Sequence, residues 1–320
     1  MRLVDAVAWF GPAALVLCAF GAASPTAASA AAILAVGTTV TLGVGHGALD
    51  HELPHQLGRA ARSATMRIAA VYAGIMGLGF AAFLAAPLPM LGVFLVISVF
   101  HFGTADVAFS ERYAGVRCRY PRLRTIALGA FPIAVPVLAQ TQAVLALIPH
   151  AHILRVLQSN EATTIRLALL GCAALATLGT TVARVRRPGA PVWYRYELAL
   201  SFAAFVWAPP GVAFFAYFGA WHAPRHLLRL AAAYGVDPYA RLDIGSARHL
   251  AGFVRRALPM SATALGLAAV VCALLAPTMP LTMVATALGF AVTVPHTFAV
   301  RFFNHSARDA KVAAVTLARG

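Results

Sequence analysis

Long runs of apolar residues, separated by short connections that contain arginine, proline or glycine, recur along the whole chain. Most of the runs reach the roughly 20 residues that an α-helix needs to cross about 30 Å of hydrocarbon. The pattern predicts an all-α, polytopic membrane bundle of about ten transmembrane helices, which forms a single integral membrane domain over residues 1–320. The predicted spans lie near residues 7–23, 28–48, 65–86, 88–109, 123–147, 163–183, 194–208, 211–231, 261–276 and 281–303.

Composition supports lipid as the solvent of this chain. Of the 320 residues, 61% are hydrophobic and only 11% are charged, too few to cover a water-soluble globule of this size. The net charge of +15 does not indicate nucleic acid as a partner, because the arginines fall in short connections and do not follow one face. The four cysteines, Cys18, Cys118, Cys172 and Cys272, are far apart and predict neither a disulfide framework nor a Cys-x-x-Cys metal site.

Arginine and lysine residues gather in the connections that follow even-numbered spans, within residues 59–67, 112–124, 184–195, 225–256 and 301–319. The connections on the other side carry almost none, and Arg155, near His150 and His152, is the exception. Because cytoplasmic connections carry the excess of positive side chains, both termini are predicted to be cytoplasmic. The chain is therefore expected to be a multi-pass protein of the inner cell membrane.

Two segments allow a second interpretation. Residues 1–30 also resemble a secretory signal peptide, although Asp5 and the length of the apolar run favour a retained first span. Residues 235–258 mix four arginines with apolar residues. This mixture is typical of a helix in the cytoplasmic interface, and a basic loop that leads into the ninth span fits equally well.

Five of the eleven histidines lie in the later part of an even-numbered span. Ionisable side chains at membrane depth are costly, so they usually face a protein interior or a cavity. Because the even-numbered spans all run toward the cytoplasm, these histidines share one level of the membrane. Helices that are distant in sequence can therefore bring their imidazoles to one point. The five residues are His46, His101, His222, His226 and His296.

Local spacing adds detail to this histidine group. His222 and His226 are four residues apart, about 40° around a helix, so both can face one metal ion. Pro224 lies between them and should bend the helix locally, because it cannot donate to the carbonyl of residue 220. Asp50 shares a helical face with His46 and is placed to orient its imidazole, whereas His51 points elsewhere. An all-imidazole site suits iron, copper, zinc or nickel, and residue types alone do not choose among them.

Four segments together resemble the motifs of the Brp/Blh family of membrane-bound β-carotene 15,15′-dioxygenases, and the resemblance runs from about residue 43 to 300. The most specific is His46-Gly47-Ala48-Leu49-Asp50-His51. The others are His101-Phe102-Gly103-Thr104-Ala105-Asp106, His222-Ala223-Pro224-Arg225-His226 and Pro295-His296.

The resemblance implies a non-haem Fe(II) enzyme that splits the central double bond of β-carotene with O2 and gives two retinal molecules. It implies that His46, His101, His222 and His226 are the catalytic iron ligands. It leaves Asp50, His51, Asp106 and His296 as substrate-site, supporting or additional ligand candidates. Aromatic residues beside the motifs, Phe102 and Trp221 among them, are candidates for a polyene tunnel, and helix packing is their alternative role. The implied partners are the carotenoid, O2, the lipid bilayer and a retinal-binding rhodopsin downstream.

Two rival functions remain open on the sequence. A membrane desaturase or hydroxylase also clusters histidines, but it needs more ligands for two irons, and only one i, i+4 pair lies in a span here. A metal or proton transporter could use intramembrane histidines, but carboxylates would be expected along its pathway. The spans hold almost none of these beyond Asp106 and Glu197.

Overall fold

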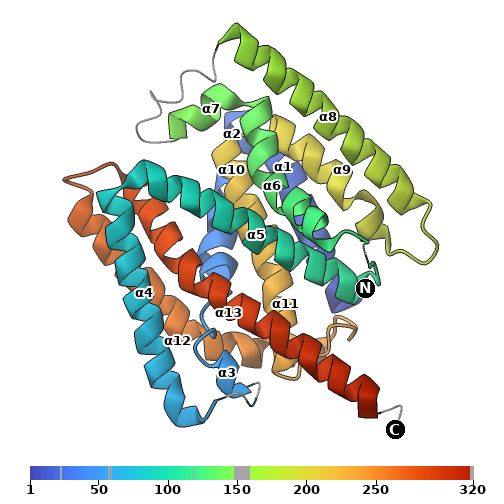
Figure 1. Ribbon diagram of the computed structural model, residues 1–320, viewed down its shortest axis with the longest axis vertical. Helices are drawn as coiled ribbons and strands as arrows, with labels where there is room; N and C mark the ends of the chain where they lie inside the picture. The colour runs from blue at the N-terminus through green and yellow to red at the C-terminus, as the bar shows by residue number, and fades with distance from the viewer. Residues whose placement is uncertain (22–23, 57, 59, 118, 148–158, 318–320) are drawn as a thin grey trace. The chain divides into compact units, whose positions relative to one another are not determined.

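The computed structural model describes residues 1–21, 24–56, 58, 60–117, 119–147 and 159–317, with side chains up to Phe302 (Figure 1). These residues form helices and connections, and their only extended pairing is an isolated bridge between Arg2 and Arg241. The prediction of an all-α membrane protein is therefore confirmed. The α-helices are α1 Leu3–Phe20, α2 Pro25–Thr38, α3 Leu53–Gln56, α4 Thr65–Ala85, α5 Pro87–Tyr113, α6 Pro121–Ala139, α7 Thr141–Leu147, α8 Asn160–Val185, α9 Val192–Trp207, α10 Pro210–Ala216, α11 Ala223–Ala233, α12 Ile244–Leu275 and α13 Leu281–Leu317. Two π-helical segments, η2 Thr39–Gly43 and η5 Tyr217–His222, and a 3-10 turn, η3 Arg62–Ala64, complete the order.

In the described part of the chain, eight helices are long and apolar enough to cross a membrane. They cover residues 3–20, 25–43, 62–85, 87–113, 121–139, 160–185, 244–275 and 281–302 and match eight of the predicted spans. The predicted seventh span corresponds to α9, which has only 16 residues. The predicted eighth span corresponds to α10, η5 and α11, whose run is divided by the π-helical segment. Cys118, His150, His152 and Arg155 lie outside the described residues.

The chain divides into two compact units. Unit 1 comprises residues 1–46 and 98–254, and unit 2 comprises residues 47–97 and 255–320. Each unit joins two segments that are distant in sequence, because the chain passes from one unit to the other three times, after residues 46, 97 and 254. The prediction of one catalytic domain over the whole chain stays a prediction.

Unit 1 packs around α1. This helix lies against α2, α9, α10 and η5, and it buries Leu15 completely. A Cβ atom at Gly11 would stand only 2.6 Å from the Cβ of Trp221, so a glycine is needed where α1 crosses η5. Since α1 supplies core residues, it is an integral helix of the unit. Cleavage after residue 30 would remove this packing.

The crossing of α5 and α6 is also set by glycines. A Cβ atom at Gly103 would overlap the carbonyl of Thr125, and one at Gly129 would overlap the carbonyl of Val99. The two backbones therefore touch directly, as is usual where small residues form a membrane helix interface. The predicted fifth span ends early, at Ala139. Gln140 follows it, and its side-chain amide donates to the carbonyl of Ala208 at 2.7 Å. This bond gives a partner to a carbonyl at the C-terminal end of α9 that has none within the helix.

Unit 2 is built on α4 and α13, which lie side by side (Figure 1). Phe83 and Phe290 form its buried core, with ring centroids 5.7 Å apart, and Phe94 packs against Phe290 at 5.9 Å. Other apolar side chains of α4 point outward, such as Leu78, which is 74% exposed. An apolar outer face on a helix of this length suits contact with lipid.

The basic segment at residues 235–258 does not form a separate interfacial helix. Its second half belongs to α12, which continues without a break from Ile244 to Leu275. Asp243 begins this helix: its carboxylate accepts the backbone N–H of Ser246 at 2.8 Å, and the Ser246 hydroxyl accepts the N–H of Asp243 at 3.0 Å. This reciprocal cap fixes the start of α12. The bond from the Ser246 backbone also lowers the pKa of the Asp243 carboxyl.

Candidate metal centre

His46 lies directly after the second membrane helix, where η2 ends and the chain turns. The side chain is buried, and its Nδ1 contacts the carbonyl of Gly43. Because a carbonyl only accepts hydrogen bonds, Nδ1 must carry the proton and donate it. The lone pair of this imidazole is therefore on Nε2, the tautomer that a metal ligand needs.

His222 ends η5, the second π-helical segment of unit 1. The two π-helical segments pack against each other, and Thr39 of η2 donates its hydroxyl to the carbonyl of Phe215 at 2.9 Å. Gly43 and Gly219 allow this approach, since a Cβ at either position would collide with the opposite segment. π-helical turns are frequent at functional sites, and here η5 ends at the candidate ligand His222 and η2 ends three residues before His46.

Pro224 explains part of this irregular geometry. It is the second residue of α11, which continues η5 without a break, and it has no N–H to donate to a carbonyl of the preceding turn. The backbone N–H of Ala223 reaches the carbonyl of Phe218, five residues back. The sequence predicted a local bend at Pro224. The structure resolves the irregularity as a wider π-helical turn that begins before the proline.

His101 comes from the middle of α5 and meets His222 in the interior of unit 1. The two Nε2 atoms are 2.9 Å apart and the ring centroids 4.7 Å apart. Ring nitrogens of His46, His101 and His222 all lie within 4.8 Å of one another. Two imidazoles bound at right angles to one metal, at about 2.0–2.1 Å each, have their nitrogens about 2.9 Å apart. The donor set and its spacing therefore fit a metal ion.

His226 lies one helical turn beyond His222 and is almost completely buried. Its ring centroid is 5.6 Å from that of His46. It is not part of the group of nitrogens within 4.8 Å of one another, so it stands at the edge of the cluster. The four predicted ligands are thus neighbours in one unit, three of them at close range.

Unit 2 holds a second polar group, formed by Asp50, Tyr72 and His296. One carboxylate oxygen of Asp50, Oδ2, accepts Nδ1–H of His296 at 2.6 Å and the hydroxyl of Tyr72 at 3.0 Å. The sequence suggested Asp50 as the partner of His46, and the hydrogen bonds of this carboxylate go instead to His296 and Tyr72. A Cβ at Gly47 would stand 3.3 Å from Nδ1 of His296, so a larger residue there would press on this group.

His51 is only partly buried, and its Nε2 lies 4.0 Å from the carboxylate of Glu52. His51 therefore contacts the next residue in sequence and is not part of the group of Asp50, Tyr72 and His296. The structure therefore separates the two histidines of the first motif: His46 belongs to the buried cluster of unit 1, and His51 lies near the surface of unit 2.

Asp106 is a buried acceptor for three side chains. Its Oδ1 accepts the indole N–H of Trp221 at 2.9 Å and the guanidinium of Arg225 at 3.1 Å, and its Oδ2 accepts the hydroxyl of Tyr217 at 3.1 Å. Phe102, another predicted site residue, packs its ring 4.9 Å from that of His222. Both residues thus lie close to the histidine cluster of unit 1.

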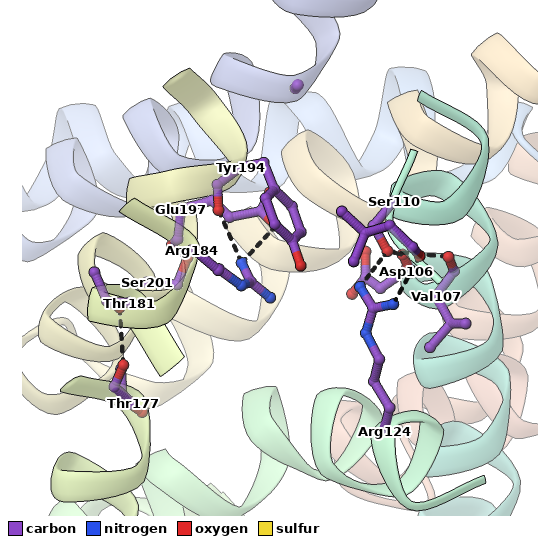
Figure 2. A network of polar contacts seen from close by, with 12 residues as sticks. Asp106, Val107, Ser110, Arg124, Thr177, Thr181, Arg184, Tyr194, Glu197 and Ser201 are labelled. Atoms are coloured by element: carbon purple, nitrogen blue, oxygen red, sulfur yellow. Dashed lines mark hydrogen bonds and ion pairs between the residues drawn. The ribbon is translucent and has the colours of Figure 1, made fainter. Parts of the chain in front are cut away.

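Sequence reasoning counted Arg184, Arg225 and Arg229 with the basic connections, but Arg184 lies in α8 and the other two lie in α11. All three side chains are buried, each at most 6% exposed. Besides Asp106, Arg225 binds Oε2 of Glu197 at 2.6 Å. Arg184 donates to the other carboxylate oxygen of Glu197, Oε1, at 3.1 Å. Figure 2 shows Arg184 directed at Glu197 and Tyr194. The sequence signal for these pairs was the position of Asp106 and Glu197 within predicted spans, where a buried carboxylate needs a cationic partner.

Comparison with known proteins supplies an independent observation. A sequence model of the β-carotene 15,15′-dioxygenase family matches residues 38–304. A relative described as a probable β-carotene 15,15′-dioxygenase Blh, from Halobacterium salinarum, is 30% identical over 253 residues, which cover 73% of this chain and 72% of the relative. No solved structure matches the chain. The matched residues include every histidine of the cluster.

Proposed function

Because the chain belongs to the β-carotene 15,15′-dioxygenase family, we propose that it splits the central double bond of β-carotene with O2, using iron held by buried histidines, and releases two retinal molecules. Family membership makes the chain a carotenoid-cleaving dioxygenase. The identity of the metal, the position of cleavage and the ligand set are the finer parts of the proposal.

The observation that supports this function best is the convergence of His46, His101 and His222, whose ring nitrogens lie within 4.8 Å of one another inside a membrane protein. We assign these three residues and His226 as ligands. Four imidazoles leave coordination positions open, and iron bound there would supply the redox chemistry that activates O2. Both oxygen atoms of O2 end as aldehyde oxygens, so the cleavage needs no added reductant.

The residues around the histidines hold them in place and keep water away. The bond from His46 to the Gly43 carbonyl fixes the orientation of that ring. The ring of Phe218 packs edge-on against His46 at 5.2 Å, and Phe102 packs against His222. Burial of the imidazoles among aromatic rings favours a reaction on an apolar polyene and protects reactive species from water.

The substrate class is supported by unit 2, which contains an apolar cavity of about 210 Å³ between α4 and α13. Asp50 and Tyr72 are polar residues of its lining. We propose that this cavity receives part of the carotenoid directly from the bilayer, where such a polyene is dissolved. The walls that face it include Ile68, Val71, Ile75, Phe298, Ala299 and Phe302.

The two rival functions have less support. A two-iron desaturase needs a second set of ligands, yet in the described part of the chain a single group of potential ligand atoms lies this close together. A proton or metal transporter needs accessible carboxylates. Asp106 and Glu197 are instead both buried in ion pairs with Arg225.

Expression of the chain in a bacterium that produces β-carotene tests the proposal, with pigments separated by chromatography. Loss of the yellow colour and appearance of retinal alone are expected, whereas unequal fragments would indicate eccentric cleavage. The His222→Ala variant, expressed to the same level, is the matched negative control. Unchanged pigment in the presence of folded, iron-loaded protein would overturn the proposal.

The cell membrane location and the cytoplasmic termini are also proposed here. The eight candidate spans are even in number, and counting the two helical runs at 192–207 and 210–233 as well keeps the number even. Either even count supports the proposal that both termini lie on the same side. A retinal-binding rhodopsin as the acceptor of the product remains a prediction of the family resemblance.

A further inference from the structure

The ion pair between Asp106 and Arg225 connects the segments that bear the candidate ligands. Asp106 follows His101 on α5 by five residues, and Arg225 immediately precedes His226 on α11. Trp221 and Tyr217, the other donors to Asp106, belong to η5, which ends at His222. One carboxylate on the His101 helix therefore receives three hydrogen bonds from the segment of His222 and His226.

Arg225 is itself fixed from several directions. Besides Asp106, its guanidinium reaches Glu197 of α9 at 2.6 Å and the carbonyl of Ala8 of α1 at 3.4 Å. Its Cζ lies 4.0 Å from the ring centroid of Trp221 and 4.8 Å from that of Phe109. A planar group with donors in a fixed fork can make these contacts together, and the ammonium of lysine cannot.

The charges in this network alternate and sum to zero, in the order Asp106, Arg225, Glu197 and Arg184. Each side chain is less than 10% exposed. Replacing a buried ion pair by apolar residues is often neutral for stability, so stability alone does not account for four buried charges. A buried ion pair can instead hold two helices in one relative position. Here it holds the helix of His101 against the segment of His222.

We infer that Arg225, through Asp106, is a positioning residue that sets the distance between His101 and His222 and thereby the affinity for the metal. This inference rests on the proposed metal site. Asp106 acts as a hydrogen-bond acceptor and not as a metal ligand, because both of its carboxylate oxygens already accept hydrogen bonds. We call Asp106 and its three donors, Tyr217, Trp221 and Arg225, the clamp, because their hydrogen bonds hold η5 and α11 against α5.

The test compares two Arg→Lys variants in purified, metal-free protein. Arg225→Lys keeps the charge and loses the fork. Arg124→Lys is the matched control: Arg124 donates to Ser110, one turn beyond Asp106 on the same helix, at 2.6 Å (Figure 2). Binding of Co(II), a spectroscopic substitute for Fe(II), is titrated by absorbance, and the melting temperature of each variant is recorded.

Arg225→Lys should weaken Co(II) binding by roughly 10- to 100-fold, as loss of an outer partner of a metal ligand usually does, and should shift the Co(II) absorption bands. Arg124→Lys should leave both unchanged. Tyr217→Phe removes a single hydroxyl from the clamp and gives a second measurement if Arg225→Lys does not fold. It should weaken binding by a smaller factor.

Wild-type affinity and spectrum in both Arg225→Lys and Tyr217→Phe would overturn the positioning role, as would an equal loss in Arg124→Lys. Failure of the wild-type protein to bind Co(II) at all would instead overturn the proposed metal site. The two failures are therefore distinguishable. Because no turnover is measured, a defect in substrate binding cannot imitate either result.

Discussion

The Nε2 atoms of His101 and His222 lie 2.9 Å apart, although 121 positions of sequence separate the two residues. At this distance one nitrogen either donates a proton to the other or shares a cation with it. The separation is close to the roughly 2.9 Å between two imidazole nitrogens bound at right angles to one metal ion. Loading with a metal should therefore need little movement of either ring.

Replacing His46, His101, His222 or His226 with alanine should remove iron and abolish retinal formation, because each change deletes a bond to the metal. Purified wild-type protein should contain about one iron per chain, as expected for a single four-imidazole site. Iron content and retinal yield are measured on the same folded preparations.

His249→Ala is the control for these variants, since His249 is an exposed residue near the start of α12. It should keep both iron and activity. If His222→Ala keeps iron and cleavage while His249→Ala loses them, the ligand assignment is wrong. Two irons per chain would favour the desaturase-like alternative.

Asp50→Asn should reduce activity by roughly 10- to 100-fold without eliminating it, because asparagine still accepts a hydrogen bond but carries no charge. Its carboxylate is bound to His296, so the two residues should act as one unit. The double variant Asp50→Asn, His296→Ala should then be no worse than His296→Ala alone. Additive losses would show that Asp50 acts through a different residue.

Val71→Trp should fill the cavity of unit 2 and raise KM for β-carotene by about tenfold, equivalent to ~1.4 kcal/mol of lost binding free energy. Leu78→Trp is the matched control, because Leu78 lies two turns further along α4, is exposed as Val71 is (74% against 63%), and does not line the cavity. Iron content should be unchanged in both. Equal KM values for the two variants would exclude the cavity as a substrate site.

Gly103→Ala should destabilise the protein by about 1–3 kcal/mol or more, because the new methyl group would overlap the carbonyl of Thr125 and force α5 and α6 apart. Gly92→Ala on the same helix is the control, since a Cβ there meets no atom within 4 Å. Thermal unfolding in detergent compares the two. A Gly103→Ala protein as stable as Gly92→Ala would contradict the close crossing.

A reporter fused after Gly320 should be active in the cytoplasm, and one inserted between Pro277 and Pro280 should report the opposite side. The exposed arginines at residues 112–124 support this orientation even after Arg184, Arg225 and Arg229 are assigned to the interior. A periplasmic C-terminus would reverse the topology.

Much of the candidate site could be predicted, because the sequence patterns that indicate it are either local or depend only on how deep a residue lies in the membrane. Composition and the length of the apolar runs identified a helical membrane protein. The direction of successive spans then placed His46, His101 and His222 at one level, where the structure brings their nitrogens together. The i, i+4 spacing identified His226 as their neighbour.

The tertiary structure alone decided which distant side chains pair. Asp50 meets His296 across 246 positions, and Arg225 meets Asp106 across 119. Helical periodicity shows which residues share a face of one helix, but it contains no information on the rotation of that helix against another. For the same reason an arginine at a span end looks identical in sequence whether it faces headgroups or a buried carboxylate. The π-helical turns before His46 and His222 depend on contacts at Gly43 and Gly219, which only the packed helices create.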